Sequence, residues 1–198
     1  MPLITDLSQL DPNGTYSYAD YLTWRFTEAV ELLRGKIWRM SPAPSLGHQV
    51  VSQNIELRLM NHLRGQPCRM FHAPFDVRLP KQAGDPNSRI HTVMQPDILV
   101  VCDPTKFDQR GCLGAPDWIV EILSPGNTQH DLRRKYALYE EHGVSEYWIV
   151  FPGDRTITVF TLQNGRYEVA GEYAEPGPVP CATLPQFVID WTEVFEGV

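Results

Sequence analysis

The chain has 198 residues, of which 42% are hydrophobic and 21% are charged, and its formal net charge is -7 at pH 7. This composition is that of a folded globular protein and excludes a disordered one, so we expect one domain over residues 1–198. The acidic balance argues against a protein that coats nucleic acid by charge alone, but it is compatible with an enzyme that has a local basic groove.

The first ninety residues predict two helices and two strands. Both helices have apolar residues at partly helical spacing, with Ser17 as a candidate N-cap of the first and Gly65 as a candidate stop of the second. In chain order we expect a helix at 17–33, a strand at 36–40, a helix at 41–65, a strand at 71–80 and a polar loop at 81–89.

The second half predicts several strands around one helix. QPDILVVCD (95–103) and DWIVEILS (117–124) are β-branched-rich runs, such as a strand buried on both faces needs. TQHDLRRKYALYEEHG (128–143) is expected to be a helix with Thr128 as N-cap and Gly143 just past its end. Further strands are expected at 145–152, 156–163 and 166–173, and a strand or short helix at 184–198. This order predicts an α/β (α+β) fold with a mixed central β-sheet flanked by helices.

The cysteines, the first residues and the length of the apolar runs are the basis for predicting the cellular compartment of the protein. The four cysteines form no CxxC pair and no zinc-like spacing with the six histidines. We therefore expect each of Cys68, Cys102, Cys112 and Cys181 to be a small buried side chain or a lone thiol. The first residues lack the layout of a signal peptide, and no apolar run approaches the roughly 18 residues of a membrane span. Together these features predict a cytoplasmic protein without a membrane partner.

Two carboxylates lie within the apolar runs of the second half. Asp97 and Glu121 would be costly to bury unpaired, so each is expected to be paired, at a strand end, or bound to a cation. If their strands are neighbours, the two carboxylates and the backbone carbonyl of Ile122 would suit Mg²⁺, with Mn²⁺ as a substitute. The structural alternative is that Asp97 caps a strand end and Glu121 makes an ion pair.

Carboxylates so placed suggest a metal-dependent nuclease, for which a lysine two residues after the glutamate is also expected. The position two residues after Glu121 holds Leu123, but Lys135 lies on the helix that follows the same strand. From there it could hold or help deprotonate the attacking water and counter the charge that builds on a phosphate. We therefore predict that the Lys135 side chain points at Glu121 and not into solvent. The alternative is an Asp131–Lys135 helix pair worth about 0.3–0.5 kcal/mol.

Other polar residues are weaker candidates, and for each a structural role is at least as plausible. Glu31 could reach a metal site through the N-terminal part of the fold. His48 and Gln49 open the second helix, where a polar side chain could face a phosphate. Arg133 and Arg134 form a short basic patch that could contact a phosphodiester. Asp76 is an acidic residue in the middle of an expected strand. Four aromatic residues are predicted to pack in the core: Trp118, Trp148, Tyr136 and Tyr139.

The pattern resembles the PD-(D/E)XK nuclease superfamily and, more closely, its Uma-type family of restriction endonucleases. The resemblance covers about residues 15–175, through VELLRGKIWRMSPAPSLGHQVVSQNI, VMQPDILVV and WIVEILSPGNTQHDLRRKYALYEEHGVSEYWIVFP. QPDILVV alone is a weak motif. VEILSP followed by DLRRKYALYEEHGVSEYWIV is specific, because many positions match in order.

The resemblance implies a restriction-endonuclease-like core in which Asp97 and Glu121 bind the metal and Lys135 is the displaced lysine. It also places Glu31, His48 and Asp131 on characteristic family positions. Glu31 is thus a further catalytic candidate, and the candidates for binding substrate are His48, Gln49, Asp131 and Arg134.

The leading hypothesis is a Mg²⁺-dependent endodeoxyribonuclease that acts on DNA as a homodimer, because two-fold assembly suits the cutting of both strands. A catalytically silent member that binds nucleic acid or a protein partner is the alternative, which the acidic net charge favours. A metal-dependent hydrolase of a nucleotide or another small phosphate ester is the third hypothesis.

Overall fold

The described residues form two six-stranded sheets, and the one with the longer strands is here called the central sheet. In chain order its strands are β3 (Arg69–His72), β6 (Ile98–Val101), β9 (Trp118–Ile122), β10 (Glu146–Phe151), β11 (Thr156–Gln163) and β12 (Arg166–Tyr173). Their order across the sheet is β12-β11-β10-β9-β6-β3. β9 and β10 pair in parallel and the other neighbours are antiparallel, so the sheet is mixed. The computed structural model describes residues 3–40, 44–124 and 129–198.

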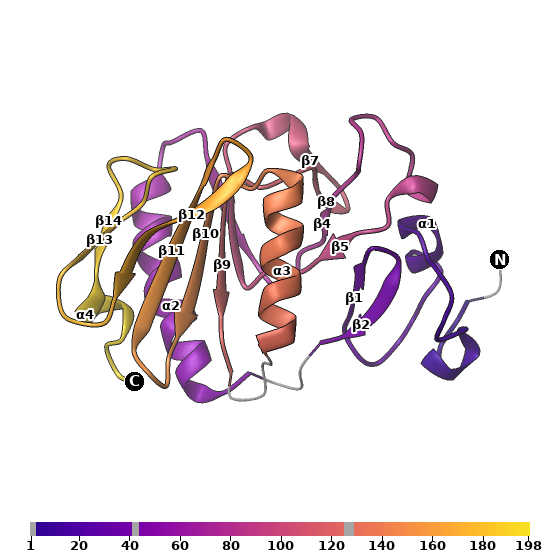
Figure 1. Cartoon of the computed structure of the whole chain (residues 1–198), viewed down its shortest axis with the longest axis horizontal. Helices are drawn as coiled ribbons and strands as arrows, with labels where there is room; N and C mark the ends of the chain where they lie inside the picture. The colour runs from indigo at the N-terminus through magenta and orange to yellow at the C-terminus, as the bar shows by residue number, and fades with distance from the viewer. Residues whose placement is uncertain (1–2, 41–43, 125–128) are drawn as a thin grey trace.

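Helices α2 (Leu46–Leu63) and α3 (Gln129–His142) cover opposite faces of the central sheet, with α3 in front of it in Figure 1 and α2 behind. α2 buries Val51, Ile55 and Leu59, which are four residues apart and therefore form one apolar stripe. None of the helices in the described part of the chain combines the length and apolar character that crossing a membrane requires.

The β9–α3–β10 segment is a crossover between two parallel strands, for which a helix is the usual connection. Because α3 follows β9 after only a few residues, the first turns of the helix lie beside the carboxyl end of that strand. The expected helix is confirmed up to its end, where Gly143 has a positive φ of 82°. Its predicted N-cap, Thr128, lies outside the described residues.

A second sheet of six short strands packs against the α3 side of the central sheet. In chain order its strands are β1 (Val30–Leu33), β2 (Lys36–Arg39), β4 (Val77–Arg78), β5 (Val93–Met94), β7 (Phe107–Asp108) and β8 (Gly111–Leu113). Their order is β2-β1-β5-β4-β8-β7. Leu33 and Met94 of this sheet share one core cluster with Leu99 and Ile119 of the central sheet. Around it lie α1 (Tyr18–Tyr21) and the 3₁₀ helices η1 (Leu7–Gln9), η2 (Asn87–Arg89) and η3 (Pro104–Lys106).

The helix predicted over residues 17–33 is wrong beyond its first turn. Ser17 caps α1 as expected, but that helix ends at Tyr21. Residues 30–33 instead form β1, buried along its whole length and paired with β2. Arg34 and Gly35 connect the two strands with positive φ angles of 51° and 80°, the backbone that a tight two-residue hairpin requires. Sheet pairing of an apolar segment outweighs its partly helical spacing.

The strand predicted over residues 71–80 is in fact two strands in different sheets. β3 ends at His72 in the central sheet, and β4 begins at Val77 in the second sheet. Pro74 lies between them and has no N–H to donate to a strand ladder. Residues 73–76 therefore pass from one sheet to the other.

The C-terminal segment packs on the α2 side, and it contains both elements that the sequence left open. They are a strand, β14 (Val188–Asp190), which pairs with β13 (Pro178–Pro180), and a short helix, α4 (Trp191–Val194). Glu146, fully buried at the start of β10, accepts hydrogen bonds from Trp148 Nε1 at 2.7 Å, Thr183 N at 2.6 Å and Cys181 Sγ at 3.1 Å. This carboxylate ties the segment to the central sheet.

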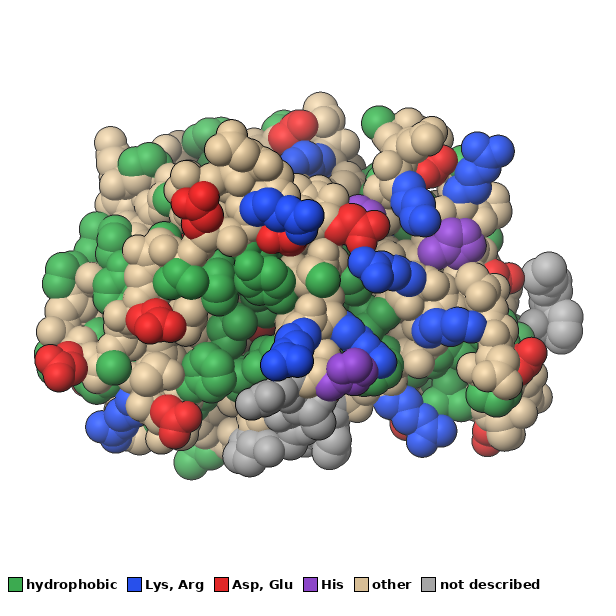
Figure 2. All heavy atoms as spheres, in the orientation of Figure 1, with side chains coloured by type: hydrophobic (Ala, Val, Ile, Leu, Met, Phe, Trp, Pro, Cys, Tyr) green, Lys and Arg blue, Asp and Glu red, His purple; other side chains and the backbone are tan. Residues whose placement is uncertain are grey.

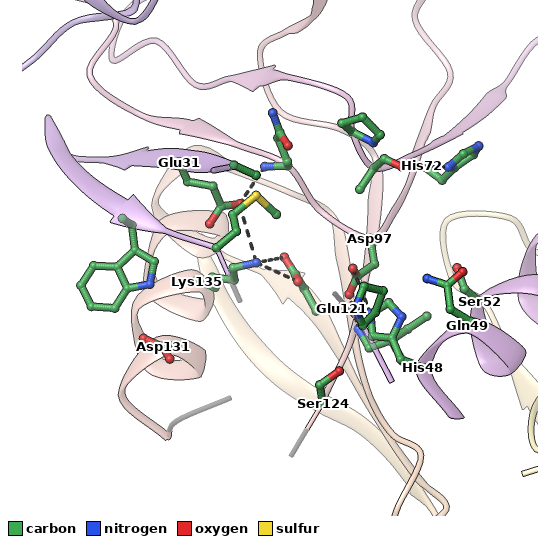
Figure 3. Close-up of a pocket in the computed structure, with 18 of the residues that line it drawn as sticks. Glu31, His48, Gln49, Ser52, His72, Asp97, Glu121, Ser124, Asp131 and Lys135 are labelled. Carbon is green, nitrogen blue, oxygen red and sulfur yellow. Dashed lines mark hydrogen bonds and ion pairs between the residues drawn. The ribbon is translucent and has the colours of Figure 1, made fainter. Parts of the chain in front are cut away.

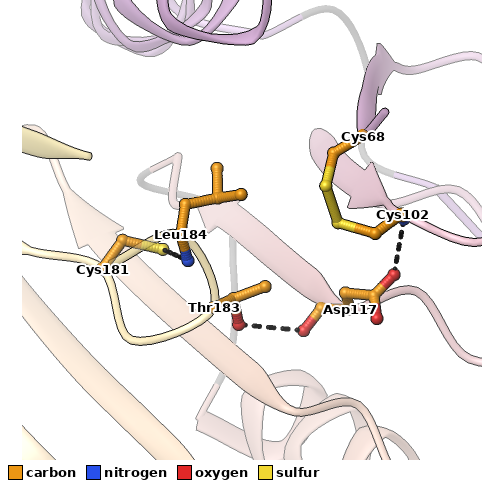
Figure 4. Close-up of a disulfide and its surroundings, with 6 residues drawn as sticks. All are labelled: Cys68, Cys102, Asp117, Cys181, Thr183 and Leu184. Atoms are coloured by element: carbon orange, nitrogen blue, oxygen red, sulfur yellow. Dashed lines mark hydrogen bonds between the residues drawn. A yellow bond between two sulfur atoms is a disulfide. The ribbon is translucent and has the colours of Figure 1, made fainter. Parts of the chain in front are cut away.

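Two of the four cysteines form a disulfide, so the prediction of lone thiols is wrong for Cys68 and Cys102 (Figure 4). Arg69 of β3 lies opposite Val101 of β6, which makes these two cysteines the next pair in register. They are 34 residues apart in the sequence, and only the strand pairing brings them together. Cys112 and Cys181 are free and buried, as expected. The cytoplasmic compartment stays a prediction. The expectation of lone thiols supported it, and the disulfide removes that support.

We expect two reactive thiols, not four, when the unreduced protein is denatured and titrated with a thiol reagent. Reduction is expected to lower the free energy of unfolding by about 3–4 kcal/mol, because it opens a loop of intermediate length in the unfolded chain. Urea unfolding with and without reductant measures this. The Cys68→Ala, Cys102→Ala double variant is the control and should not respond to reductant. Four reactive thiols in the unreduced, denatured chain would contradict the disulfide.

Candidate active site

A pocket of about 570 Å³ opens between the two sheets and the helices α2 and α3 (Figure 3). Its wall includes side chains from β1, β2, α2, β9 and α3 and the turn that follows β3. Most of the candidates named from the sequence line it: Glu31, His48, Gln49, Asp97, Glu121, Ile122, Asp131 and Lys135. Arg134 and the weaker candidates Asp76 and Arg133 are not part of its wall.

Asp97 and Glu121 come together because β6 and β9 are antiparallel neighbours. Ile98 lies opposite Val120, so the next pair in register is Asp97 and Glu121. The backbone N–H of Ile122 donates to Asp97 Oδ2 at 2.7 Å. Side chains alternate along a strand, which turns Glu121 toward α3, on the same face as Ile119. The condition that the two strands be neighbours is therefore met.

Lys135 reaches Glu121 from α3. Its Nζ donates to both carboxylate oxygens, Oε1 and Oε2, at 2.8 Å each, and lies 3.7 Å from Glu31 Oε1. The side chains of Lys135, Glu121 and Glu31 are only 16%, 7% and 2% exposed. The predicted geometry, in which the lysine points at Glu121 and not into solvent, is confirmed.

The electrostatics of this cluster keep a positive charge at its centre. Burial raises the pKa of Glu121, although the Lys135 ammonium beside it acts in the opposite direction. Burial alone would lower the pKa of Lys135, but the carboxylates of Glu121, Glu31 and Asp97 hold it above its ordinary value. Three acids thus surround one ammonium, which is an environment that favours cations.

Tyr139 also contacts Glu121, which the sequence did not predict. Its hydroxyl donates to Glu121 Oε1 at 2.6 Å, and the side chain is fully buried. The sequence indicated a packing role, and the ring does pack against Tyr147, with centroids 5.2 Å apart. Tyr139 follows Lys135 by four residues and so shares its helix face. This four-residue spacing from Lys135 is the feature of the sequence from which the contact with Glu121 could have been predicted.

His48 lies against Asp97 at the first turn of α2. Its Nε2 is 3.1 Å from Asp97 Oδ1, and its buried Nδ1 has no hydrogen-bond partner within residues 3–40, 44–124 and 129–198. The backbone places it there because Ser45 caps the helix by accepting from His48 N. The contact that the structure gives to His48 is with a carboxylate, and its role in binding substrate stays a prediction.

Glu31 is held by Gln95, another residue that the sequence did not indicate. The backbone N–H of Gln95 donates to Glu31 Oε1 at 2.8 Å, and its side-chain amide donates to Asp76 Oδ1 at 2.9 Å. Asp76 is also within 3.4 Å of the Tyr18 and Tyr21 hydroxyls, and burial raises its pKa. This network fixes Glu31 from the side of the second sheet.

The remaining substrate-binding candidates lie at or beside the pocket. Gln49 and Asp131 line it, from α2 and α3 respectively. The Arg134 guanidinium lies 4.2 Å from the centre of the Trp38 ring, and Trp38 is itself part of the pocket wall. Lys and Arg side chains on the α3 face gather over the half of the molecule that the second sheet forms (Figure 2).

Comparison with known proteins decides the family. A family model described as "Putative restriction endonuclease", Uma2, matches residues 18–192. The chain belongs to the Uma2 family. The resemblance seen in its motifs is thereby confirmed.

Two similar proteins extend the comparison. The Uma2 chain is 29% identical over 130 residues to the uncharacterized protein slr1290 of Synechocystis sp., a match that covers 65% of this chain and 64% of that protein. A crystal structure described as "a putative nuclease belonging to DUF820", from Anabaena variabilis, matches with a TM-score of 0.72 and 23% identity. That match covers 90% of this chain and 97% of the other. It shows the fold, and the predicted fold class is confirmed.

The donor set of this Uma2 chain fits a hydrated Mg²⁺ ion better than a dehydrated metal. Within the described ranges, no three His, Cys, Asp or Glu side chains form a group that could hold a metal ion. Mg²⁺, however, is usually held by one or two carboxylates and keeps several water ligands. Asp97 and Glu121, with the Ile122 carbonyl, would supply such a set. The ammonium of Lys135, seated on both oxygens of Glu121, shows that this carboxylate accepts a cation.

Proposed function

We propose that this Uma2 protein is a Mg²⁺-dependent endodeoxyribonuclease that hydrolyses DNA phosphodiester bonds. One observation carries the proposal: Asp97, directly before β6, and Glu121 of the neighbouring β9 line one pocket in which Lys135 contacts Glu121 from α3. The family description, "Putative restriction endonuclease", supports the same class of reaction.

The metal would be held by Asp97, Glu121 and the carbonyl of Ile122, with Mn²⁺ as a substitute. When bound, it would polarise the phosphate and lower the pKa of the attacking water. Lys135 would orient that water with its Nζ and offset the negative charge that builds on the phosphate oxygens. The three surrounding carboxylates keep Lys135 protonated. We therefore assign it the role of a hydrogen-bond donor and not that of a general base.

Four residues are proposed to contact the DNA strand near the reacting phosphate. His48, Gln49 and Asp131 line the pocket, and Arg134 lies beside it over Trp38. The basic side chains over the second sheet offer phosphate contacts on the same face, despite the net charge of -7. Cleavage of both strands would suit a homodimer, which stays a prediction.

We expect the wild-type protein to nick or linearise supercoiled plasmid with Mg²⁺ or Mn²⁺ and to lose this activity when EDTA removes the metal. Gel electrophoresis of the plasmid measures it, and restored activity on adding excess Mn²⁺ to the EDTA-treated protein is the control. Cleavage that persists in EDTA would contradict the metal dependence. Absence of Mn²⁺ binding by calorimetry would favour the silent, binding member of the fold. Strong competition by a nucleotide or small phosphate ester would indicate the third hypothesis.

A further inference from the structure

The two oxygens of the Glu121 carboxylate are not equivalent. Oε1 accepts hydrogen bonds from Lys135 Nζ at 2.8 Å and from the Tyr139 hydroxyl at 2.6 Å. For Oε2, the hydrogen bond that the structure shows in the described part of the chain is the one from Lys135, also at 2.8 Å. Among the described residues, one oxygen is thus held by two donors from α3, and the other is held by the ammonium.

The packing around Tyr139 holds its hydroxyl in one position. The side chain is fully buried, and its ring packs edge-on against Tyr147, with an interplanar angle of 66°. Most buried hydroxyls in proteins have a hydrogen-bond partner, and the acceptor for the Tyr139 hydroxyl is the carboxylate of Glu121. Hydrogen bonds from a neutral donor to a carboxylate are among the stronger ones in proteins. The packing of the ring therefore transmits a fixed orientation to Glu121.

We propose that Tyr139 is a positioning residue for the metal site: its hydroxyl holds Oε1 of Glu121 and thereby fixes the orientation of the carboxylate that would hold the cation. This inference rests on the proposed function, because it takes Glu121 as a metal ligand. Partners that orient a ligating side chain typically change metal affinity by about 10–100-fold when they are lost. Tyr139 thus acts through Glu121 and need not touch DNA.

Tyr147 provides a matched control on the neighbouring strand β10. It is as fully buried as Tyr139 and belongs to the same ring pair, but among the residues that the structure describes its hydroxyl has no hydrogen-bond partner. Tyr139→Phe and Tyr147→Phe therefore remove the same atom from the same cluster. Of the two, Tyr139→Phe is the one that removes a hydrogen bond to Glu121.

The test titrates the wild type and both variants with Mn²⁺ by calorimetry, at one pH, and compares their melting temperatures without metal. Tyr139→Phe is expected to weaken Mn²⁺ binding by about tenfold or more. Tyr147→Phe is expected to bind Mn²⁺ like the wild type. In cleavage assays, Tyr139→Phe should require more Mn²⁺ for half-maximal rate while its KM for DNA stays unchanged.

Each outcome decides between a positioning and a structural role. Wild-type Mn²⁺ affinity in Tyr139→Phe overturns the inference, and so does an equal loss in both variants, which would indicate packing. Failure of the proposed function looks different. If the wild type binds Mn²⁺ but does not cut DNA, the nuclease assignment fails while the titration still decides the role of Tyr139. If the wild type binds no Mn²⁺, Glu121 is not a metal ligand and both proposals fall.

Discussion

Lys135→Met is expected to slow DNA cleavage by about a hundredfold to a thousandfold, the usual effect of removing one donor that stabilises a transition state. Methionine keeps most of the length of the side chain but removes the ammonium, which is 2.8 Å from both oxygens of Glu121. Mn²⁺ binding, measured by calorimetry, should stay as tight as in the wild type or become tighter, because the ammonium no longer competes for the carboxylate. Single-turnover cleavage at saturating Mn²⁺ measures the first effect.

In the Lys135→Met variant, thermal stability should depend more strongly on bound metal than it does in the wild type. Without Lys135, the carboxylates of Glu121 and Glu31 stay buried without their cation, which typically costs about 3–5 kcal/mol. A bound Mn²⁺ would replace the lost positive charge, so the rise in melting temperature on adding Mn²⁺ should exceed that of the wild type. Lys81→Met, at an exposed position outside the pocket, is the control. Loss of Mn²⁺ binding together with cleavage would show instead that Lys135 builds the metal site.

Glu121→Gln is expected to abolish both cleavage and metal binding. Glutamine has nearly the same shape and can still accept from Tyr139 and Lys135, but it lacks the negative charge that holds a divalent cation. The loss of Mn²⁺ affinity should exceed the about 10–100-fold that follows loss of an orienting partner. Calorimetry with Mn²⁺ and plasmid cleavage on the same preparation measure the two effects.

Glu146→Gln is the matched control for this variant. Glu146 is a second buried glutamate of the central sheet, on β10 next to β9. Its carboxylate accepts hydrogen bonds from Trp148, Thr183 and Cys181. Its replacement is expected to lower the melting temperature without changing Mn²⁺ affinity. Plasmid cleavage by Glu121→Gln at the wild-type rate would exclude Glu121 from the metal site and with it the proposed mechanism.

The sequence by itself determined the part of the site that is local in the chain. The run WIVEIL is apolar enough to be a central strand, and the helix that follows is connected to its carboxyl end by only a few residues. A short connection of this kind leaves little freedom in where the first turns of the helix lie. The contact between Lys135 and Glu121 could therefore be predicted from their positions, 14 residues apart.

Only the tertiary structure decided which distant segments complete the site. Glu31 is held by Gln95 across 64 residues, because residues 30–33 form a buried hairpin strand and not the expected helix. The disulfide depends in the same way on the pairing of β3 with β6. Local spacing predicts a helix or strand and its apolar face, but the pairing of strands depends on the burial of the whole core. The family motif could indicate Asp97 and Glu121, and only the antiparallel pairing of β6 with β9 sets them opposite each other.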